Sequence, residues 1–155
     1  MEGNKVKTSR RIFLRNAVAL SVGAIILPST VMAEKQVAAF QAGTVDDSLA
    51  NLFESAQVEE SDKITIKTPD IAENGKVVPI EITADLAKVE SITIFAEKNP
   101  MPLVGKFNFA GNRKGWLKTR IKMGGTGNVI AIVKADGKLY KASREIKVTI
   151  GGCGG

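Results

Sequence analysis

Histidine is absent from this 155-residue chain, and cysteine occurs only once. Without histidine, the chain cannot form the Ser-His and Cys-His arrangements that activate a nucleophile. A single cysteine without histidine is also a poor basis for a zinc or copper site, and it cannot form an internal disulfide. We therefore expect no metal, no bound cofactor and no reaction that the chain catalyses alone.

The basic excess of the chain is concentrated at its amino end. Lysine and arginine number 22 against 16 aspartates and glutamates. Five of the basic residues and one acidic residue lie within residues 1–33, which leaves 17 basic against 15 acidic residues. A net charge of +2 on the remainder gives no reason to expect binding to nucleic acid.

Residues 1–33 read as an export signal. Arg10 and Arg11 form an arginine pair followed by apolar residues, as in twin-arginine signals, and an apolar run over 17–27 comes next. The small residues that end at Ala33 suit cleavage after that position. The run of about eleven residues is shorter than the roughly 20 that span a membrane. We expect a periplasmic protein without a membrane anchor, while an amino-terminal anchor or a buried helix remains an alternative.

The next segment, residues 34–60, reads as an amino-terminal extension that contains one helix over residues 44–56. Thr44 and Asp47 have the spacing of a capping box, with Asp in place of the usual Glu or Gln. Leu49, Leu52 and Phe53 then fall on one helical face. Packing of this face against the rest of the fold is the simpler interpretation, and binding of a partner is the alternative.

Residues 61–150 show the period-two alternation of β-strands. The pattern indicates seven strands: 64–66, 78–83, 92–94, 107–109, 117–123, 129–133 and 140–150. Six of them alternate, whereas 129–133 is apolar throughout, as in a central strand that is covered on both faces. Asp136-Gly137 and Asn74-Gly75 are strong hairpin signals between them. The chain without its signal, 122 residues long, suits one domain. The pattern predicts a mainly β fold, an immunoglobulin-like sandwich of about seven strands with a short amino-terminal helix.

Two further stretches have alternative interpretations. The stretch from Gly124 to Asn128 superficially resembles a phosphate-binding loop, but it precedes a strand where such loops precede a helix, so we do not expect nucleotide binding. One face of the strand near residue 116 carries a tryptophan and three basic side chains. This face is either simply solvated or a contact surface for a partner. Its residues are Trp116, Lys118, Arg120 and Lys122.

The only cysteine is the third residue from the carboxyl end of the printed sequence, between two pairs of glycines. Four glycines favour neither helix nor strand, so residues 151–155 should form a flexible arm that carries one thiol. The arm would allow the thiol to reach about 10 Å from Ile150, at roughly 3.3–3.6 Å per residue. In an oxidising compartment, an unpaired thiol implies chemistry or an intermolecular disulfide. A frayed tail is the alternative. The arm residues are Gly151, Gly152, Cys153, Gly154 and Gly155.

This ending, together with the stretch 68–83 and the export signal, resembles the SoxY family of sulfur carriers. The resemblance implies that Cys153 binds thiosulfate-derived sulfur covalently, and that the four flanking glycines form the carrier arm. It also implies a heterodimer with SoxZ. The expected enzymes are the SoxAX cytochrome complex, the SoxB hydrolase and, where present, the SoxCD dehydrogenase.

Three other functions remain open from the residues themselves. A general periplasmic thiol redox carrier would form mixed disulfides, including a disulfide-linked homodimer through Cys153. A ubiquitin-like sulfur carrier would need ATP, which the expected export denies it, and a fold with fewer strands. A purely structural sandwich domain would not need Cys153 at all.

Overall fold

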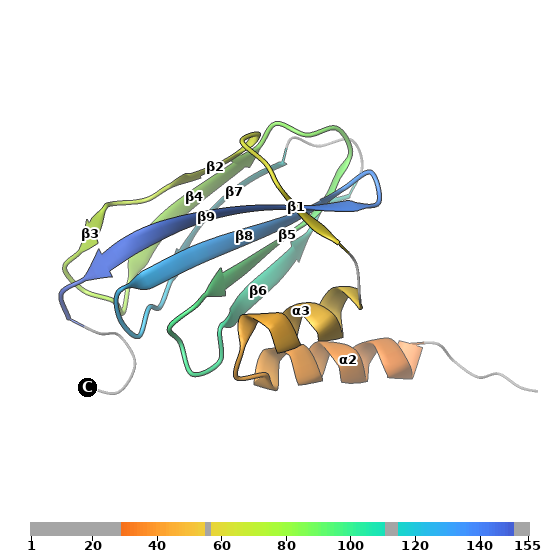
Figure 1. The fold of residues 1–155 in the computed structure, drawn as a ribbon, viewed down its shortest axis with the longest axis horizontal. Coiled ribbons are helices and arrows are strands. Elements are labelled where there is room, and N and C mark those ends of the chain that lie inside the picture. Colours follow the sequence, from red (N-terminus) through yellow and green to blue (C-terminus); the bar gives the residue numbers. More distant parts are fainter. Residues whose placement is uncertain (1–28, 55–56, 111–114, 151–155) are drawn as a thin grey trace, which may run out of the picture. The chain divides into compact units, whose positions relative to one another are not determined.

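A computed structural model describes residues 29–54, 57–110 and 115–150, and it describes no side chains before residue 33. In these ranges, two helices precede nine strands (Figure 1). The helices are α2 (Ser29–Gln41) and α3 (Val45–Phe53). The strands are β1 (Val58–Glu60), β2 (Ile64–Lys67), β3 (Ile71–Ala72), β4 (Val78–Ala84), β5 (Val89–Ala96), β6 (Leu103–Asn108), β7 (Gly115–Ile121), β8 (Gly127–Ala135) and β9 (Lys138–Val148).

The strands form two sheets that pack face to face. The larger sheet has the order β1-β9-β8-β5-β6, and β3 pairs with β9 beside this path. The smaller sheet has the order β2-β4-β7, and all of its pairs are antiparallel. This arrangement is the immunoglobulin-like sandwich that the alternating pattern predicted.

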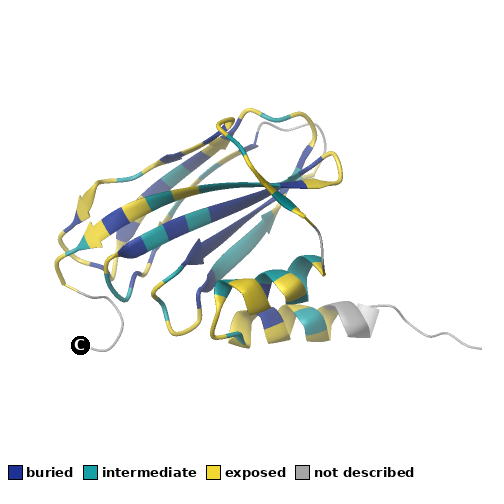
Figure 2. Cartoon of the chain, in the orientation of Figure 1, coloured by how far each residue is buried: buried dark blue, intermediate teal, exposed yellow. Residues whose placement is uncertain are grey.

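The main core lies between the two sheets. It is formed by the inward-facing residues of each strand, such as Ile80 and Ile82 from β4, Ile92 and Ile94 from β5, and Val129 from β8, all almost completely buried. Along β4, buried residues alternate with exposed or half-buried ones, as the period-two pattern requires (Figure 2). By contrast, six consecutive residues of β5 are buried, because this strand is covered on both faces.

A second core covers the outer face of the larger sheet. Phe95, Ile132 and Leu139 are buried there against apolar side chains of α3 and Ala39 of α2. The two helices are joined through the buried Ser48, whose Oγ lies 3.0 Å from the carbonyl oxygens of both Ala39 and Thr44. The helix pair therefore covers one face of one sheet.

The predicted helix over 44–56 is confirmed as α3, whose N-cap is Thr44. The Thr44 hydroxyl accepts a hydrogen bond from the backbone N–H of Asp47 (3.1 Å), as the capping pattern indicated. The helix ends at Phe53, and the expected end at residue 56 lies outside the described residues. The helix α2 was not predicted, because its first residues were assigned to the export signal. Ala33, the expected cleavage position, is an exposed residue of this helix.

The seven predicted strands correspond to β2 and β4–β9. The sequence pattern missed β1 and β3, which contain three and two residues and are too short to show a period. The Asp136-Gly137 hairpin between β8 and β9 is confirmed, and both residues have positive φ (48° and 76°), as a two-residue hairpin of this type requires. The hairpin expected at Asn74-Gly75 is wrong. A turn is present there, in which the N–H of Val77 donates to the carbonyl of Asn74 (3.3 Å), but the flanking strands β3 and β4 pair with other strands and not with each other. The stretch 124–128 leads into β8 and not into a helix.

Candidate functional site

The described chain ends at Ile150, three residues before Cys153. Cys153 and its four glycine neighbours lie outside the described residues, as do Arg10 and Arg11. The structure therefore describes the base of the predicted arm, which is the end of β9 and the residues that hold it.

One edge of β9 is held by the segment that contains β3. The N–H of Lys147 donates to the carbonyl of Asp70 (3.0 Å), and the N–H of Thr149 donates to the carbonyl of Ala72 (3.1 Å). Farther along, the N–H of Gly75 donates to the carbonyl of Ile150 itself (2.8 Å). The backbone is thus hydrogen-bonded on this edge as far as the last described residue.

The other edge of β9 is held by the connection between β7 and β8. The N–H of Val148 donates to the Oγ1 of Thr126 (2.9 Å). Gly75 also accepts a hydrogen bond from the N–H of Met123 (2.7 Å), so the end of β7 and Ile150 contact the same turn. Because Ile150 is fixed, the Cα of Cys153 can lie at most about 10 Å from it, at roughly 3.3–3.6 Å per residue.

Apolar side chains are exposed around this base. Ile150 is 66% exposed, Ile71 of β3 is 57% exposed, and Val77 is 56% exposed. Ile71 pairs with Lys147 of β9, and Val77 follows the turn that binds Ile150. A macromolecule that contacts the arm would therefore meet apolar surface at its base.

The predicted tryptophan-containing face of β7 is confirmed as exposed. Trp116 is 52% exposed, and Lys118, Arg120 and Lys122 are exposed with it. On the adjacent β4, Glu81 accepts a hydrogen bond from Trp116 Nε1 (3.3 Å) and lies 3.9 Å from Lys118 Nζ. This face belongs to the smaller sheet, whose last β7 residues adjoin the turn at Gly75.

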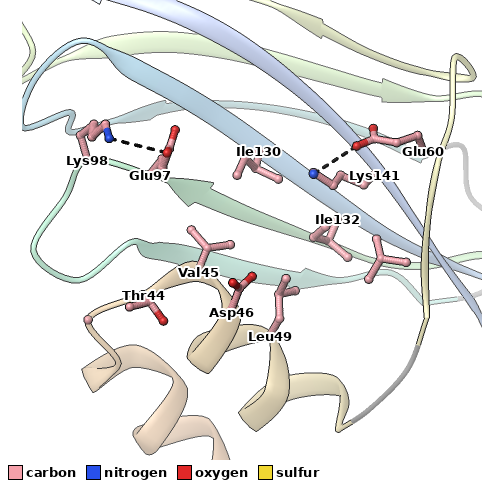
Figure 3. Close-up of a pocket in the computed structure, with 12 residues that line it drawn as sticks. Thr44, Val45, Asp46, Leu49, Glu60, Glu97, Lys98, Ile130, Ile132 and Lys141 are labelled. Atoms are coloured by element: carbon pink, nitrogen blue, oxygen red, sulfur yellow. Dashed lines mark ion pairs between the residues drawn. The ribbon is translucent and has the colours of Figure 1, made fainter.

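A hollow of about 600 Å³ lies between α3 and the larger sheet (Figure 3). Val45 and Leu49 of α3 face Ile130 and Ile132 across it, and charged side chains line its rim. Two ion pairs on the rim, Glu60–Lys141 (3.1 Å) and Glu97–Lys98 (3.7 Å), balance four of those charges.

One carboxylate on the rim of this hollow, that of Glu97, is held by a hydrogen bond within the domain. The side-chain amide of Asn128 donates to Glu97 (2.9 Å) and, with help from the backbone of Asn128 and from Lys98, lowers the pKa of that carboxyl. The hollow contains neither histidine nor cysteine, so its groups resemble a packed helix–sheet contact more than a reactive site.

No metal site is evident in the described part of the chain, where no three His, Cys, Asp or Glu side chains are grouped closely enough to hold an ion. The described helices, α2 and α3, are also too short or too polar to cross a membrane.

Comparison with protein families identifies the chain. The family model of the sulfur oxidation protein SoxY matches residues 49–153, which is more than half of the sequence. The chain belongs to the SoxY family. The matched region begins within α3 and ends at the cysteine that the sequence analysis singled out, so it includes both sheets of this SoxY protein and its predicted arm as far as Cys153.

Solved structures agree with this assignment. The sulfur carrier protein SoxY from Chlorobium limicola f thiosulfatophilum is 40% identical, with a TM-score of 0.64 over 69% of this chain and 97% of that one. A superoxide reductase (neelaredoxin) from Ignicoccus hospitalis is 16% identical, with a TM-score of 0.50 over 59% of this chain and 94% of that one, and it shows the fold alone. A comparison with curated proteins finds no match.

Sequence reasoning identified Cys153 and the face at Trp116, but it missed the residues that fix the base of the arm. Gly75 was recognised only as part of a turn signal, and Thr126 only as part of a stretch that superficially resembles a phosphate-binding loop. Their contacts with Val148 and Ile150 join residues far apart in the sequence, and no local pattern in a single sequence reports such a contact.

Proposed function

We propose that this SoxY protein is a carrier that holds thiosulfate-derived sulfur covalently on Cys153 while separate enzymes process it. The observation that carries the proposal is the family match, which extends to the only cysteine of the chain. The similar protein from Chlorobium limicola f thiosulfatophilum is named a sulfur carrier. A covalent carrier needs a nucleophilic atom outside its core, and a thiol is the strongest nucleophile available in this sequence.

The fold supports this role through its anchored end. Hydrogen bonds from three segments fix the chain as far as Ile150, and the next three residues lead to Cys153. Because the hydrogen-bonded anchor ends before the glycines, motion of the thiol does not disturb the packing of the domain. Each enzyme then needs to recognise only the short arm and its cargo, and the intermediates do not diffuse away.

The first step of the proposed cycle is an oxidative conjugation. The thiolate of Cys153 and the terminal sulfur of thiosulfate form an S–S bond, and two electrons leave to a c-type cytochrome complex, for which SoxAX is the candidate. The product is a thiol-bound sulfane that ends in a sulfonate group.

The later steps remove the sulfur atoms as sulfate. A hydrolase, for which SoxB is the candidate, adds water across the bond between the sulfane and the sulfonate, releases sulfate and leaves a persulfide on Cys153. A dehydrogenase such as SoxCD then oxidises the outer sulfur with three waters, releasing six electrons and six protons, and a second hydrolysis frees the thiol. The carrier itself supplies the attachment atom and its presentation, so we do not regard it as an enzyme.

The compartment and the permanent partner belong to the same proposal. Arg10 and Arg11 direct the chain through the twin-arginine pathway to the periplasm, with cleavage after Ala33, and a SoxZ subunit binds it as a heterodimer. Support for both comes from the arginine pair in the sequence and from the membership of the SoxY family.

The decisive experiment measures the intact mass of the purified carrier after incubation with thiosulfate and the conjugating cytochrome complex from the same cells. We expect a mass increase equal to one bound thiosulfate in the wild type and none in the Cys153→Ser variant. Serine keeps the size of the side chain, but its hydroxyl is a far weaker nucleophile near neutral pH.

Two results would contradict the proposal. One is the same adduct on the Cys153→Ser variant, which would place the sulfur on another residue. The other is a wild-type protein that acquires only mixed disulfides with small thiols and no thiosulfate-derived adduct, which would favour a general thiol redox carrier.

A further inference from the structure

The outer face of the smaller sheet carries an excess of positive charge. Its cations, together with the exposed Trp116, are here called the basic face, which consists of Lys67 of β2, Trp116, Lys118 and Arg120 of β7, and Lys122 just after β7. Glu81 is the only carboxylate in β2, β4 and β7. Among the described elements, the two helices cover the other sheet and leave this face exposed.

Three cations of the basic face are available to a partner. Glu81 accepts a hydrogen bond from Trp116 Nε1 and lies within 4 Å of Lys118 Nζ, so its charge is already engaged. Lys67, Arg120 and Lys122 make no ion pair within the described residues. A hollow of about 430 Å³, lined by Pro79, Lys118, Thr119 and Arg120, lies beside the last two.

The basic face reaches the base of the arm. Gly75 donates to the carbonyl of Ile150 and accepts from the N–H of Met123, so one turn joins the last described residue to the end of β7. Lys122 precedes Met123 directly. An enzyme that takes Cys153 into its active site must lie within about 10 Å of Ile150, and the end of the basic face is therefore among the surfaces it meets.

We propose that the basic face is a docking surface for acidic protein surface around the active-site entrance of the enzymes that process the cargo. This inference rests on the proposed carrier function. The excess of uncompensated cations next to the arm favours a partner of opposite charge, and Trp116 provides the kind of exposed aromatic anchor that is enriched at interfaces. Arginine adds a planar, bidentate donor for carboxylates.

The expected effect is mainly on association. Electrostatic steering between complementary surfaces raises association rates by about 10- to 1,000-fold, and salt weakens it. Removing charges of the basic face should therefore lower kcat/KM for conjugation and leave kcat nearly unchanged. It should not change the intrinsic reactivity of the thiol.

The test compares two charge-reversal variants with equal change in net charge. R120E/K122E alters the basic face beside the arm, and K63E/K138E is the matched control. Lys63 and Lys138 are exposed and lie before or at the start of their strands, at the ends remote from Ile150. Conjugation of thiosulfate by the cytochrome complex of the same cells is followed by intact mass, with the carrier purified together with any partner subunit.

Ionic strength provides the specific readout. At about 0.01 M salt, where the Debye length is about 30 Å, R120E/K122E should lose at least about 10-fold in kcat/KM, and the control should stay within about twofold of the wild type. At about 1 M salt, where the Debye length is about 3 Å, the three proteins should converge. The rate of alkylation of Cys153 by iodoacetamide should be the same in all three.

Several results would overturn the docking surface. Equal losses in R120E/K122E and in the control would show that only net charge matters. A loss that persists in high salt would show a structural effect, and a failure of R120E/K122E to assemble with its partner subunit, seen by light scattering, would make the face a subunit interface. If the wild type acquires no thiosulfate adduct, the proposed function fails and the docking inference fails with it, whereas an unaffected R120E/K122E overturns the docking surface alone.

Discussion

The outer faces of the two sheets differ in polarity and exposure: one is apolar and covered by helices, and the other is polar and exposed. On the larger sheet, Phe95, Ile132 and Leu139 point outward and are buried by α2 and α3. On the smaller sheet, the outward positions of β7 carry Trp116, Lys118 and Arg120, which are exposed. Covering a face with helices stabilises the domain through apolar burial, whereas a polar face adds little stability and stays free to bind.

The base of the predicted arm lies next to the exposed face. The base of the arm, at Ile150, is joined through Gly75 to the end of β7, which belongs to the exposed face. The helices of the larger sheet pack around Phe95 and Leu139, on residues that have no part in the anchor. The residues that stabilise the domain and the residues that hold the base of the arm therefore lie in different parts of one domain. Substitutions can affect one set without the other.

The largest expected effect concerns the covered face. Phe95→Ala should lower the free energy of unfolding by about 3–5 kcal/mol, because it leaves a cavity under the helices. Trp116→Ala, on the exposed face, should cost far less, since surface substitutions usually change stability by less than about 0.5 kcal/mol. Urea denaturation measures both. Similar losses in the two variants would mean that the two faces do not differ as described.

An intermediate effect is expected where the two sheets approach each other. A Cβ added at Gly115 would lie 2.8 Å from a side-chain carbon of Val89 and 3.0 Å from Cβ of Ala84, one residue from each sheet. Gly115→Ala should therefore destabilise the domain by about 1–3 kcal/mol through overpacking.

Gly125→Ala is the matched control for this variant, because a Cβ at that position meets nothing within 4 Å. Thermal unfolding compares the two proteins. A Gly115→Ala variant as stable as Gly125→Ala would show that the sheets can separate at this point without cost.

The smallest effect concerns the anchor of the arm. Thr126→Val removes the hydroxyl that accepts from the N–H of Val148, and it should cost about 1 kcal/mol. Hydrogen exchange of the Val148 amide should become faster, while exchange of the Ile132 amide in β8 should change much less. Thr126→Ser keeps the hydroxyl and should restore slow exchange. Fast exchange in Thr126→Ser would assign the effect to packing of the methyl group instead.

Much of the fold could be predicted from the sequence, because its signals are local. The alternation of Val78, Ile80 and Ile82 with polar residues is visible in seven consecutive positions, and Thr44 and Asp47 mark the start of α3 within four. The two strands that were missed, β1 and β3, exist through pairing with β9 and have little pattern of their own. The helix α2 was missed because its first residues lie within the predicted export signal.

The candidate site, like the fold, could be predicted only where its signals are local in the sequence. Cys153 was identified because one cysteine among glycines is conspicuous in the sequence, and the exposed face at Trp116 followed from alternation. Residues 151–155 lie outside the described part of the chain, so the arm stays a prediction. The anchor could not be predicted, because its hydrogen bonds join residues far apart in the sequence. Gly75 binds Ile150, 75 positions later, and Thr126 binds Val148, 22 positions later.

The sequence by itself determined seven of the nine described strands, the start of α3 and the position of the only thiol, because periodicity, capping and composition act over a few neighbouring residues. Only the tertiary structure decided which sheet face the helices cover, and that the turn at Gly75 holds Ile150 beside the basic face. Such choices depend on which distant segments pack together, and the free energy of that packing comes from burial and hydrogen bonds shared between segments.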